Sequence, residues 1–257
     1  MPAPDFFRIH KDKWSLDSSL DLTIVIPCLN EEARIVPTLE AVTGAMRPLT
    51  ISYEVLVIDD GSQDRTADVV ENYQKAHPDL PVRLHRNPHN LGLSRSYIDG
   101  AFMGRGKYYR MVSGDNPEPA AALGAVFTKL GAADMIIPYH AHVTGKPRMR
   151  LFLSGLYTRL VNYLSGYHIR YYNGGALHAR YNVMRWGPYS FGFGFQAELI
   201  TRLLDEGASY IEVPLDVTHV EKSGGNSAIN FGNFLSVGHT LLEIFIRRIR
   251  KRIFQKM

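Results

Sequence analysis

Residues 53–77 read YEVLVIDDGSQDRTADVVENYQKAH, and this stretch decides the fold class. Its first part is a continuous apolar run that ends in two aspartates and a glycine, which is typical of a strand buried on both faces of a sheet. Its second part carries apolar residues at helical spacing and begins with Ser62 and Asp64, both of which are preferred helix N-caps. A buried strand followed directly by a helix predicts a parallel sheet with helices on both faces.

The same alternation extends outward from this stretch. Further strands are predicted over residues 22–29, 82–87 and 107–115, and helices over residues 30–46, with Asn30 as N-cap, and 92–105. We therefore predict an α/β fold with a mostly parallel central sheet flanked by helices. Such sheets bind ligands beyond the carboxyl ends of their strands. The turn at residues 27–31, the Asp59–Asp60 pair and Asp115 all fall at such ends.

Composition excludes several other classes of protein. The 257 residues are 45% hydrophobic and 21% charged, as in ordinary globular domains, and they are enough for one large domain with an appendage. The single cysteine, Cys28, excludes an intrachain disulfide. No apolar stretch approaches the roughly 18 residues that span a bilayer. Dinucleotide-binding (G-x-G-x-x-G) and P-loop glycine motifs are also lacking. We expect a cytoplasmic protein without a signal peptide.

The end of the chain is a basic amphipathic segment. Residues 244–257 read IFIRRIRKRIFQKM, and the chain from Phe234 to Ile249 places apolar residues at helical spacing. One interpretation is an interfacial helix on anionic lipid headgroups, which would make the protein peripheral on the cytoplasmic face of the membrane. The other is a helix docked on the core with a solvated charged end. The sequence lacks a nucleic-acid-binding module, so no nucleic-acid partner is expected.

Several motifs together resemble family 2 glycosyltransferases of the GT-A fold. The segments PCLNEE (27–32), VIDDGSQDRT (57–66), RNPHNLGLSRSYIDGA (86–101), GDN (114–116) and the stretch 195–227 occur in the order and spacing of that family. Among its branches the chain is similar to the dolichol- or polyprenyl-phosphate sugar transferases. The resemblance covers roughly residues 20 to 230. It implies a GT-A domain over residues 21–230, which leaves an N-terminal extension (1–20) and the basic amphipathic segment, predicted as a helix, at 231–257.

The resemblance also implies a site for a nucleoside-diphosphate sugar. The residues implied to bind this donor are Pro27, Leu29, Glu31, Asp59, Asp60, Asn90, Gly92 and Asp115. Where the family usually carries D-x-D, this chain has Ser113-Gly114-Asp115, so only the second carboxylate is present. Mg²⁺ or Mn²⁺ can still bind at Asp115 if water and the diphosphate supply the other ligands. Asn116, Glu118 or His219 could supply one further metal ligand, and the sequence does not choose among them.

A second departure concerns the acceptor. Many family members have an acidic pair where this chain has Phe195-Gln196, and one of the two acids is the base that deprotonates a sugar hydroxyl. A phosphate monoester is already an anion near neutral pH and needs no base, so the departure favours a lipid-phosphate acceptor. By resemblance, the residues that hold this phosphate are Arg150, Ser154, Lys222 and Ser227.

The sequence therefore predicts an inverting, metal-assisted transfer of a sugar to a polyprenyl (dolichol-type) phosphate, with Asp115, Arg150 and Lys222 in catalytic roles. Two different functions stay open beside it. Glu198 could act as a base for a glycan or small-molecule hydroxyl, or the chain could be a non-catalytic relative that binds nucleotide sugars. The sugar and the base of the donor are not determined by these motifs.

Overall fold

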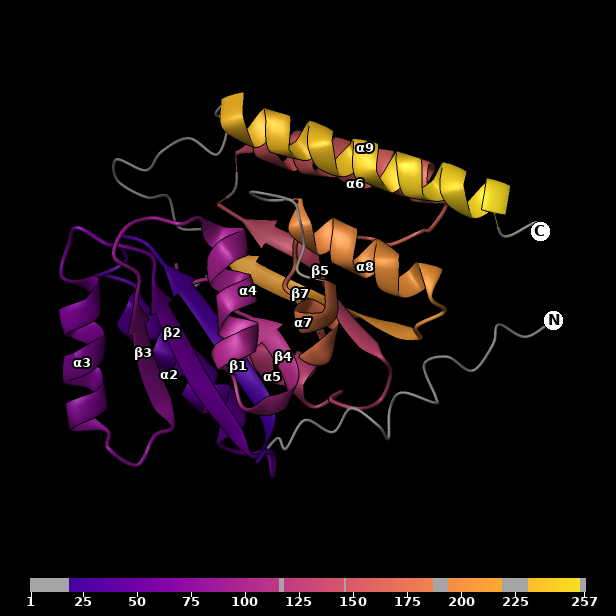
Figure 1. Ribbon diagram of the computed structural model, residues 1–257. Coiled ribbons are helices and arrows are strands. Elements are labelled where there is room, and N and C mark those ends of the chain that lie inside the picture. Colours follow the sequence, from indigo (N-terminus) through magenta and orange to yellow (C-terminus); the bar gives the residue numbers. More distant parts are fainter. Residues whose placement is uncertain (1–18, 116–117, 146, 187–193, 219–230, 255–257) are drawn as a thin grey trace.

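The computed structural model describes residues 19–115, 118–145, 147–186, 194–218 and 231–254. Strands and helices alternate along most of the chain (Figure 1). In chain order the elements are β1 (Leu20–Cys28), α2 (Ile35–Met46), β2 (Tyr53–Asp59), α3 (Thr66–Ala76), β3 (Val82–Arg86), α4 (Leu93–Met103), β4 (Gly106–Met111), α5 (Ala120–Phe127), β5 (Met135–Thr144), α6 (Arg148–Ser165), β6 (Leu177–Ala179), α7 (Tyr181–Trp186), α8 (Phe195–Asp205), β7 (Tyr210–Thr218) and α9 (Phe231–Phe254).

The strands form one seven-stranded sheet in the order β3-β2-β1-β4-β6-β5-β7. Strand β6 is antiparallel to both of its neighbours, and every other pairing in the sheet is parallel. The predicted α/β class with a mostly parallel sheet is therefore confirmed. Strands β4 and β5 are both antiparallel to β6 and are therefore parallel to each other. As a result, β5 and β7 end at the same sheet edge as β1, β2 and β4. We call this edge the carboxyl edge.

Strands β1 and β2 are mainly apolar and buried because both faces of the sheet are covered there. In β1, Leu22, Ile24 and Ile26 pack in the cluster that includes α2 and α5. Val25 on the opposite face packs in a second cluster with residues of α4 and α8. All four side chains are fully buried. A strand buried on both faces has no polar positions to alternate, which explains the continuous runs in the sequence.

Two predicted helix starts are corrected by the structure. The helix predicted from Asn30 begins at Ile35, and the one predicted from Ser62 or Asp64 begins at Thr66. Asn30 has a positive φ of 56° and its side chain accepts a hydrogen bond from the Gln63 N–H (2.9 Å), so it belongs to a loop. Asp64 still binds the Thr66 N–H at the start of α3 (2.9 Å). Tertiary bonds between the two loops therefore outweigh the local preference for a helix.

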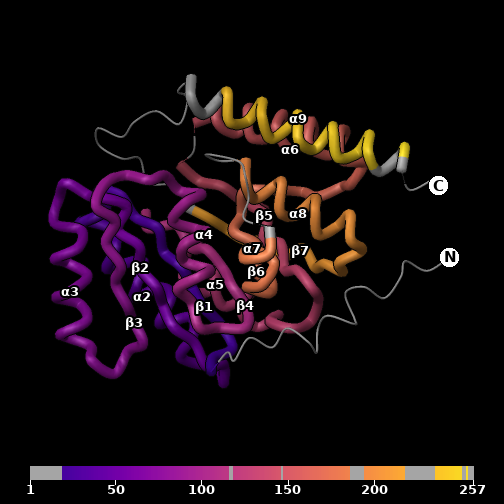
Figure 2. Tube along the Cα trace, viewed as in Figure 1, coloured from indigo at the N-terminus to yellow at the C-terminus, as the bar shows by residue number. Residues whose placement is uncertain are grey.

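The last helices form a separate layer. Helices α6 and α9 lie side by side at one end of the molecule, with α8 between them and the sheet (Figures 1 and 2). The inner face of α9 carries buried Thr240 and Ile244, and its Arg247 bonds Asp205 at the end of α8 (2.9 Å). Within the described ranges, none of the helices is long and apolar enough to cross a membrane.

Candidate active site

The carboxyl edge is built first by two loops that bind each other. The loop after β1 and the loop after β2 are joined by hydrogen bonds from the Asn30 N–H to Ser62 Oγ (2.9 Å) and from the Glu31 N–H to Thr66 Oγ1 (2.8 Å). The parallel pairing of Cys28 with Asp59 brings the two loops to the same level. Pro27, Leu29 and Glu31, which the sequence assigns to the donor, therefore lie beside the aspartate pair.

The two aspartates have different environments. Asp60 accepts hydrogen bonds from Asn87 Nδ2 (2.8 Å), the Leu91 N–H (2.9 Å) and the Gly92 N–H (2.8 Å), which occupy both carboxylate oxygens. Asp59 accepts one bond from the Ser62 N–H through Oδ1 (3.0 Å). Asp60 therefore fixes the loop that carries Asn90 and Gly92. Asp59 is the member of the pair whose hydrogen-bonding capacity is less fully used by these loops.

Gly61 allows the loops to approach each other closely. Its φ is +78°, and a Cβ at this position would lie 2.5 Å from the carbonyl carbon of His89. We expect Gly61→Ala to destabilise the fold by about 1–3 kcal/mol, the usual cost of backbone strain, and to weaken nucleotide binding because the Asn90 loop must move.

The control variant is Gly238→Ala in α9, where an added Cβ meets no atom within 4 Å. That variant should be neutral or more stable by up to about 1 kcal/mol. Thermal unfolding and nucleotide titration measure both effects, and a fully stable Gly61→Ala with normal binding would contradict the tight-approach argument.

Asp115 lies in the loop that follows β4, and this loop is fixed to the end of β1. Thr38 Oγ1 donates to the Gly114 carbonyl (3.0 Å), and a Cβ on Gly114 would lie 2.9 Å from Cys28 Cβ. The Ser113 hydroxyl donates to Asp115 Oδ1 at 2.5 Å. Ser113 therefore orients the one carboxylate of the S-G-D triplet and leaves Oδ2 for another ligand. Cys28 itself is buried, and burial with nearby carboxylates raises the pKa of its thiol.

A buried ion pair lies behind this loop. The fully buried Arg110 donates to Glu118 Oε1 (2.8 Å) and to the Gly175 carbonyl (3.2 Å). Burial raises the pKa of Glu118, and the Arg110 guanidinium partly offsets that effect. Glu118 therefore anchors the chain just after Asp115, which argues against it as a metal ligand. Asn116 and His219, which the sequence also allows as metal ligands, lie outside the described residues.

The residues around Asp115 fit a divalent ion only in part. The described ranges contain no cluster of three or more His, Cys, Asp or Glu side chains that could hold a metal. One carboxylate together with substrate phosphates and water is a sufficient set for Mg²⁺. The donor set at this edge is therefore consistent with a metal that binds together with a nucleotide diphosphate.

Helix α6 carries the predicted acceptor residues that the structure describes. Arg150 and Ser154 are four residues apart on this helix and are both partly buried. Ser154 hydrogen-bonds Tyr171, and burial raises the pKa of Tyr171 to about 12, so this phenol keeps its proton at neutral pH. Lys222 and Ser227 lie outside the described residues, so the structure does not bring the predicted acceptor set together.

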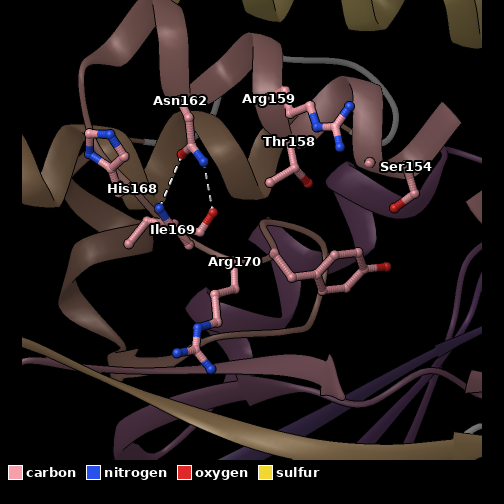
Figure 3. Close-up of a pocket in the computed structure, with 9 residues that line it drawn as sticks. Ser154, Thr158, Arg159, Asn162, His168, Ile169 and Arg170 are labelled. Carbon is pink, nitrogen blue, oxygen red and sulfur yellow. Dashed lines mark hydrogen bonds between the residues drawn. The ribbon is translucent and has the colours of Figure 1, made fainter. Parts of the chain in front are cut away.

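A pocket of about 430 Å³ lies between α6 and the loop before β6 (Figure 3). Its lining includes Ser154, Thr158, Arg159, His168, Arg170 and Tyr171. Asn162 fixes its wall, since the Asn162 side chain donates to the Ile169 carbonyl (2.9 Å) and accepts from the Ile169 N–H (3.1 Å). The pocket is rich in positively charged and neutral donors, as an anion requires. Sequence reasoning missed Arg159, His168 and Tyr171, although Arg159 lies three helical turns after Arg148 on the same face of α6.

Two residues of α8 decide whether this site has a base. Gln196 is buried and accepts a hydrogen bond from the Gly175 N–H (3.0 Å), so it holds the chain before β6. Glu198 is fully buried and pairs with Arg202 at 2.7 Å. In the structure Glu198 is therefore a buried carboxylate held in an ion pair with Arg202.

The sheet order, the reversed strand β6 and the loops at the carboxyl edge together define the GT-A glycosyltransferase fold. The model of the glycosyl transferase family 2 matches residues 23–175, and the chain belongs to this family. It is a glycosyltransferase enzyme, as the sequence predicts.

Alignments with curated relatives cover most of the chain. A dolichyl-phosphate beta-glucosyltransferase of Trichomonas vaginalis is 24% identical over 89% of this chain and 72% of its own. An undecaprenyl-phosphate mannosyltransferase of Micrococcus luteus is 29% identical over 81% of this chain and 87% of its own. A polyprenol monophosphomannose synthase of Mycolicibacterium smegmatis is 26% identical, with coverage of 87% and 86%. The predicted resemblance to polyprenyl-phosphate sugar transferases is confirmed.

Solved structures show the same fold. The glucosyl-3-phosphoglycerate synthase from Mycobacterium tuberculosis, in complex with Mn²⁺, UDP and glucosyl-3-phosphoglycerate, has a TM-score of 0.60 and 16% identity over 92% of this chain and 81% of its own. The same enzyme with Mg²⁺ and UDP has a TM-score of 0.61 and 18% identity, with coverage of 89% and 80%. Both structures therefore pair a divalent metal with a nucleoside diphosphate on this fold.

Proposed function

We propose that this enzyme transfers a sugar from a nucleoside-diphosphate sugar to a polyprenyl phosphate of the dolichol type. The observation that carries the proposal is the environment of Gln196 and Glu198 on α8, the two residues at which a base would be expected. Gln196 has no acidic group, and Glu198 is buried in an ion pair with Arg202. A hydroxyl acceptor needs a base within reach, whereas a phosphate does not. The names of the relatives point to the same class of acceptor.

In this proposal the donor binds at the carboxyl edge. Asp59, Asn90 and the loop after β1 would bind the nucleoside, and Asp115 would lie at the diphosphate. A divalent ion bound at Asp115 would neutralise the charge that develops on the leaving diphosphate. Ser113 orients the Asp115 carboxylate for this role.

The acceptor approaches from the α6 side. Arg150 and Ser154 would hold the phosphate so that one of its oxygens attacks the anomeric carbon of the sugar as the bond to the diphosphate breaks. A single in-line displacement inverts the configuration at that carbon. Lys222 and Ser227 stay predicted partners of the same phosphate. The location of the enzyme on the cytoplasmic face of the membrane also stays a prediction.

An Arg150→Ala variant tests the acceptor side. Loss of one charge-assisted hydrogen bond is worth roughly 1.5–3 kcal/mol, so we expect kcat/KM for the acceptor to fall about ten- to a hundredfold. Donor binding should stay near the wild-type value. The matched control is Arg47→Ala, an exposed arginine at the end of α2 and so at the opposite edge of the sheet.

The deciding assay offers labelled nucleotide sugars with a short-chain polyprenyl phosphate, the matching polyprenol and simple sugars. Transfer to the phosphate alone supports the proposal. Efficient transfer to a hydroxyl, with none to the phosphate, would overturn the acceptor assignment and favour Glu198 as a base. Binding of a nucleotide sugar without any transfer or hydrolysis would favour a non-catalytic role.

A further inference from the structure

Exposed apolar side chains gather on the outer helix layer. Of the 15 large hydrophobic residues exposed in the described part of the chain, 12 lie on α6 or α9. On α6, six of them repeat at spacings of three or four residues and so form one face: Met149, Phe152, Leu153, Leu156, Leu160 and Tyr163. Phe152 is 63% exposed and Tyr163 is 83% exposed. Soluble proteins rarely leave so many apolar residues together without a partner.

Helix α9 has a similar outer face. Leu235, Leu242, Phe245, Ile249 and Ile253 are all exposed and lie on the side of the helix opposite to buried Ile244. The sequence pattern predicts one apolar face over residues 234–249, and the structure divides it. Val237 and Leu241 are partly buried toward the protein, whereas Phe245 and Ile249 are exposed. Because α6 and α9 lie side by side in one layer, we call their two exposed apolar faces together the outer face (Figure 1).

The charges beside the outer face are positive. Arg148 and Arg159 are exposed one helical turn from Phe152 and Tyr163, and Arg250 is exposed one turn from Ile253. Helix α6 has no acidic residue, and the only one in α9 is Glu243. Arginines 247 and 248 instead bond α8 and the Ser165 carbonyl, which fixes the layer to the protein.

From this apolar and cationic combination we infer that the outer face docks on an anionic lipid bilayer, with α6 and α9 lying in the plane of the headgroups. A symmetric dimer through the same face would bring its arginines against each other, which is unfavourable. An interfacial pair of helices buries the apolar side chains and places the arginines among the phosphates. Exposed Tyr163 is also of the type that is enriched at this depth of a membrane.

The proposed active site lies close to the helix layer that would dock on the bilayer. Strand β5 ends at the carboxyl edge and α6 begins four residues later, at Arg148, so the start of α6 lies near the edge where the donor would bind. The pocket beside Ser154 and Thr158 opens along α6 itself. A docked α6 would place the pocket at the level of the lipid phosphates. This part of the inference rests on the proposed function, in which the pocket region receives the phosphate of the acceptor. Docking itself requires no assumption about the reaction.

Binding to sedimented vesicles tests the docking. The full chain is mixed with vesicles of phosphatidylcholine, with or without phosphatidylglycerol. We expect binding to the anionic vesicles that weakens in high salt. The variant Phe152→Ser/Leu156→Ser/Leu160→Ser should bind them at least about tenfold more weakly, since each side chain loses its apolar burial. The variant Arg148→Glu/Arg250→Glu should lose roughly fivefold per arginine. Arg159 is left unchanged because it also lines the pocket.

The matched control is Phe102→Ser/Tyr210→Ser. These two residues are 57% and 41% exposed but belong to α4 and β7. The control should bind vesicles as the wild type does, and nucleotide titration with thermal unfolding checks that each variant is folded. Deletion of residues 240–257 is a poorer test because it also removes Ile244 and Arg247 from the core of the layer.

The results separate the docking from the proposed function. If docking is right, the α6 variant keeps turnover of a short-chain acceptor in solution and loses turnover of a long-chain acceptor in vesicles. Vesicle binding by wild type without turnover of either acceptor would reject the proposed function and leave the docking intact. Equal vesicle binding by wild type and the α6 variant would overturn the docking. So would a wild-type dimer that ignores vesicles and becomes a monomer in the α6 variant, as measured by sedimentation velocity.

Discussion

Transfer by the Asp115→Ala variant is expected to fall by about a thousandfold or more, and the dependence of the reaction on Mg²⁺ or Mn²⁺ should largely disappear. Asp115 is the one carboxylate of the S-G-D triplet, and its loop is fixed to β1 through Gly114 and Thr38. Removal of one group that stabilises developing charge costs about a hundred- to a thousandfold in other enzymes, and loss of a metal adds to this. Steady-state rates over a range of metal concentrations measure both effects.

Substitutions of Ser113 provide the controls for this experiment. Ser113→Ala removes the hydrogen bond to Asp115 Oδ1 and keeps the carboxylate, so it should cost much less than Asp115→Ala. Ser113→Asp restores the usual D-x-D of the family and should tighten the metal or leave its affinity unchanged. Undiminished transfer by Asp115→Ala would remove the metal–diphosphate role from this residue.

The Arg110→Met variant is expected to cause the largest loss of stability. It leaves Glu118 buried without its partner, and breaking a buried ion pair on one side costs about 3–5 kcal/mol. For a chain of this size that corresponds to a fall in Tm of roughly 10 °C. The double variant Arg110→Met/Glu118→Leu removes both charges and should recover most of the stability. If the double variant were as unstable as the single one, the stacking of the Arg110 guanidinium over the Phe127 ring would be the more important contribution.

The pH dependence of the Arg110→Met variant gives a second check. Burial raises the pKa of Glu118 above its ordinary value of 4.5. The folded protein then binds this proton more tightly than the unfolded chain, so the contribution of Glu118 to stability is full below about pH 4.5 and is lost as the pH rises through its folded-state pKa. The Arg110 guanidinium lowers that pKa, so its removal raises the pKa of Glu118 further in the variant than in the wild type. The difference between the variant and the wild type should therefore grow from acidic toward neutral pH. Unfolding midpoints at several pH values would show it.

The part of the chain that carries the proposed donor site is predictable from the sequence because it is built from local units. Strands β1 and β2 are short apolar runs, and each strand in residues 20–111 is followed by a helix, so strand ends and the polar residues after them are visible directly. Asp59, Asp60 and Asp115 are brought to one edge as predicted. The start of α2 is the exception, because the bonds of Asn30 go to a loop more than 30 residues away.

The part that carries the proposed acceptor site is less predictable because its geometry depends on residues that are distant in the sequence. The sequence indicates that Arg150 and Ser154 share a helical face, but not that Asn162 binds the chain at Ile169 and so forms a pocket. The pairing of Arg110 with Glu118 is also hidden, since the two residues lie eight positions apart and do not belong to one helix or strand. The apolar stripe of α6 is present in the sequence as helical spacing. Only the structure shows that this stripe faces away from the protein.

The reversal of β6 has a consequence for how such enzymes can diverge. An antiparallel strand begins at the edge where its neighbours end, so the segment 166–176 before β6 has to cross the carboxyl edge. This segment, with Tyr171, forms a wall of the pocket, and it lies outside the β-α units that place Asp59, Asp60 and Asp115. Gly175 of this segment accepts a hydrogen bond from Arg110, which pairs with Glu118 behind the Asp115 loop, so changes near Gly175 would also affect that loop. Under the proposed function, changes nearer Tyr171 would alter the acceptor pocket and leave the β-α units of the donor site in place. The topology thus places acceptor choice and donor choice on different segments of the chain.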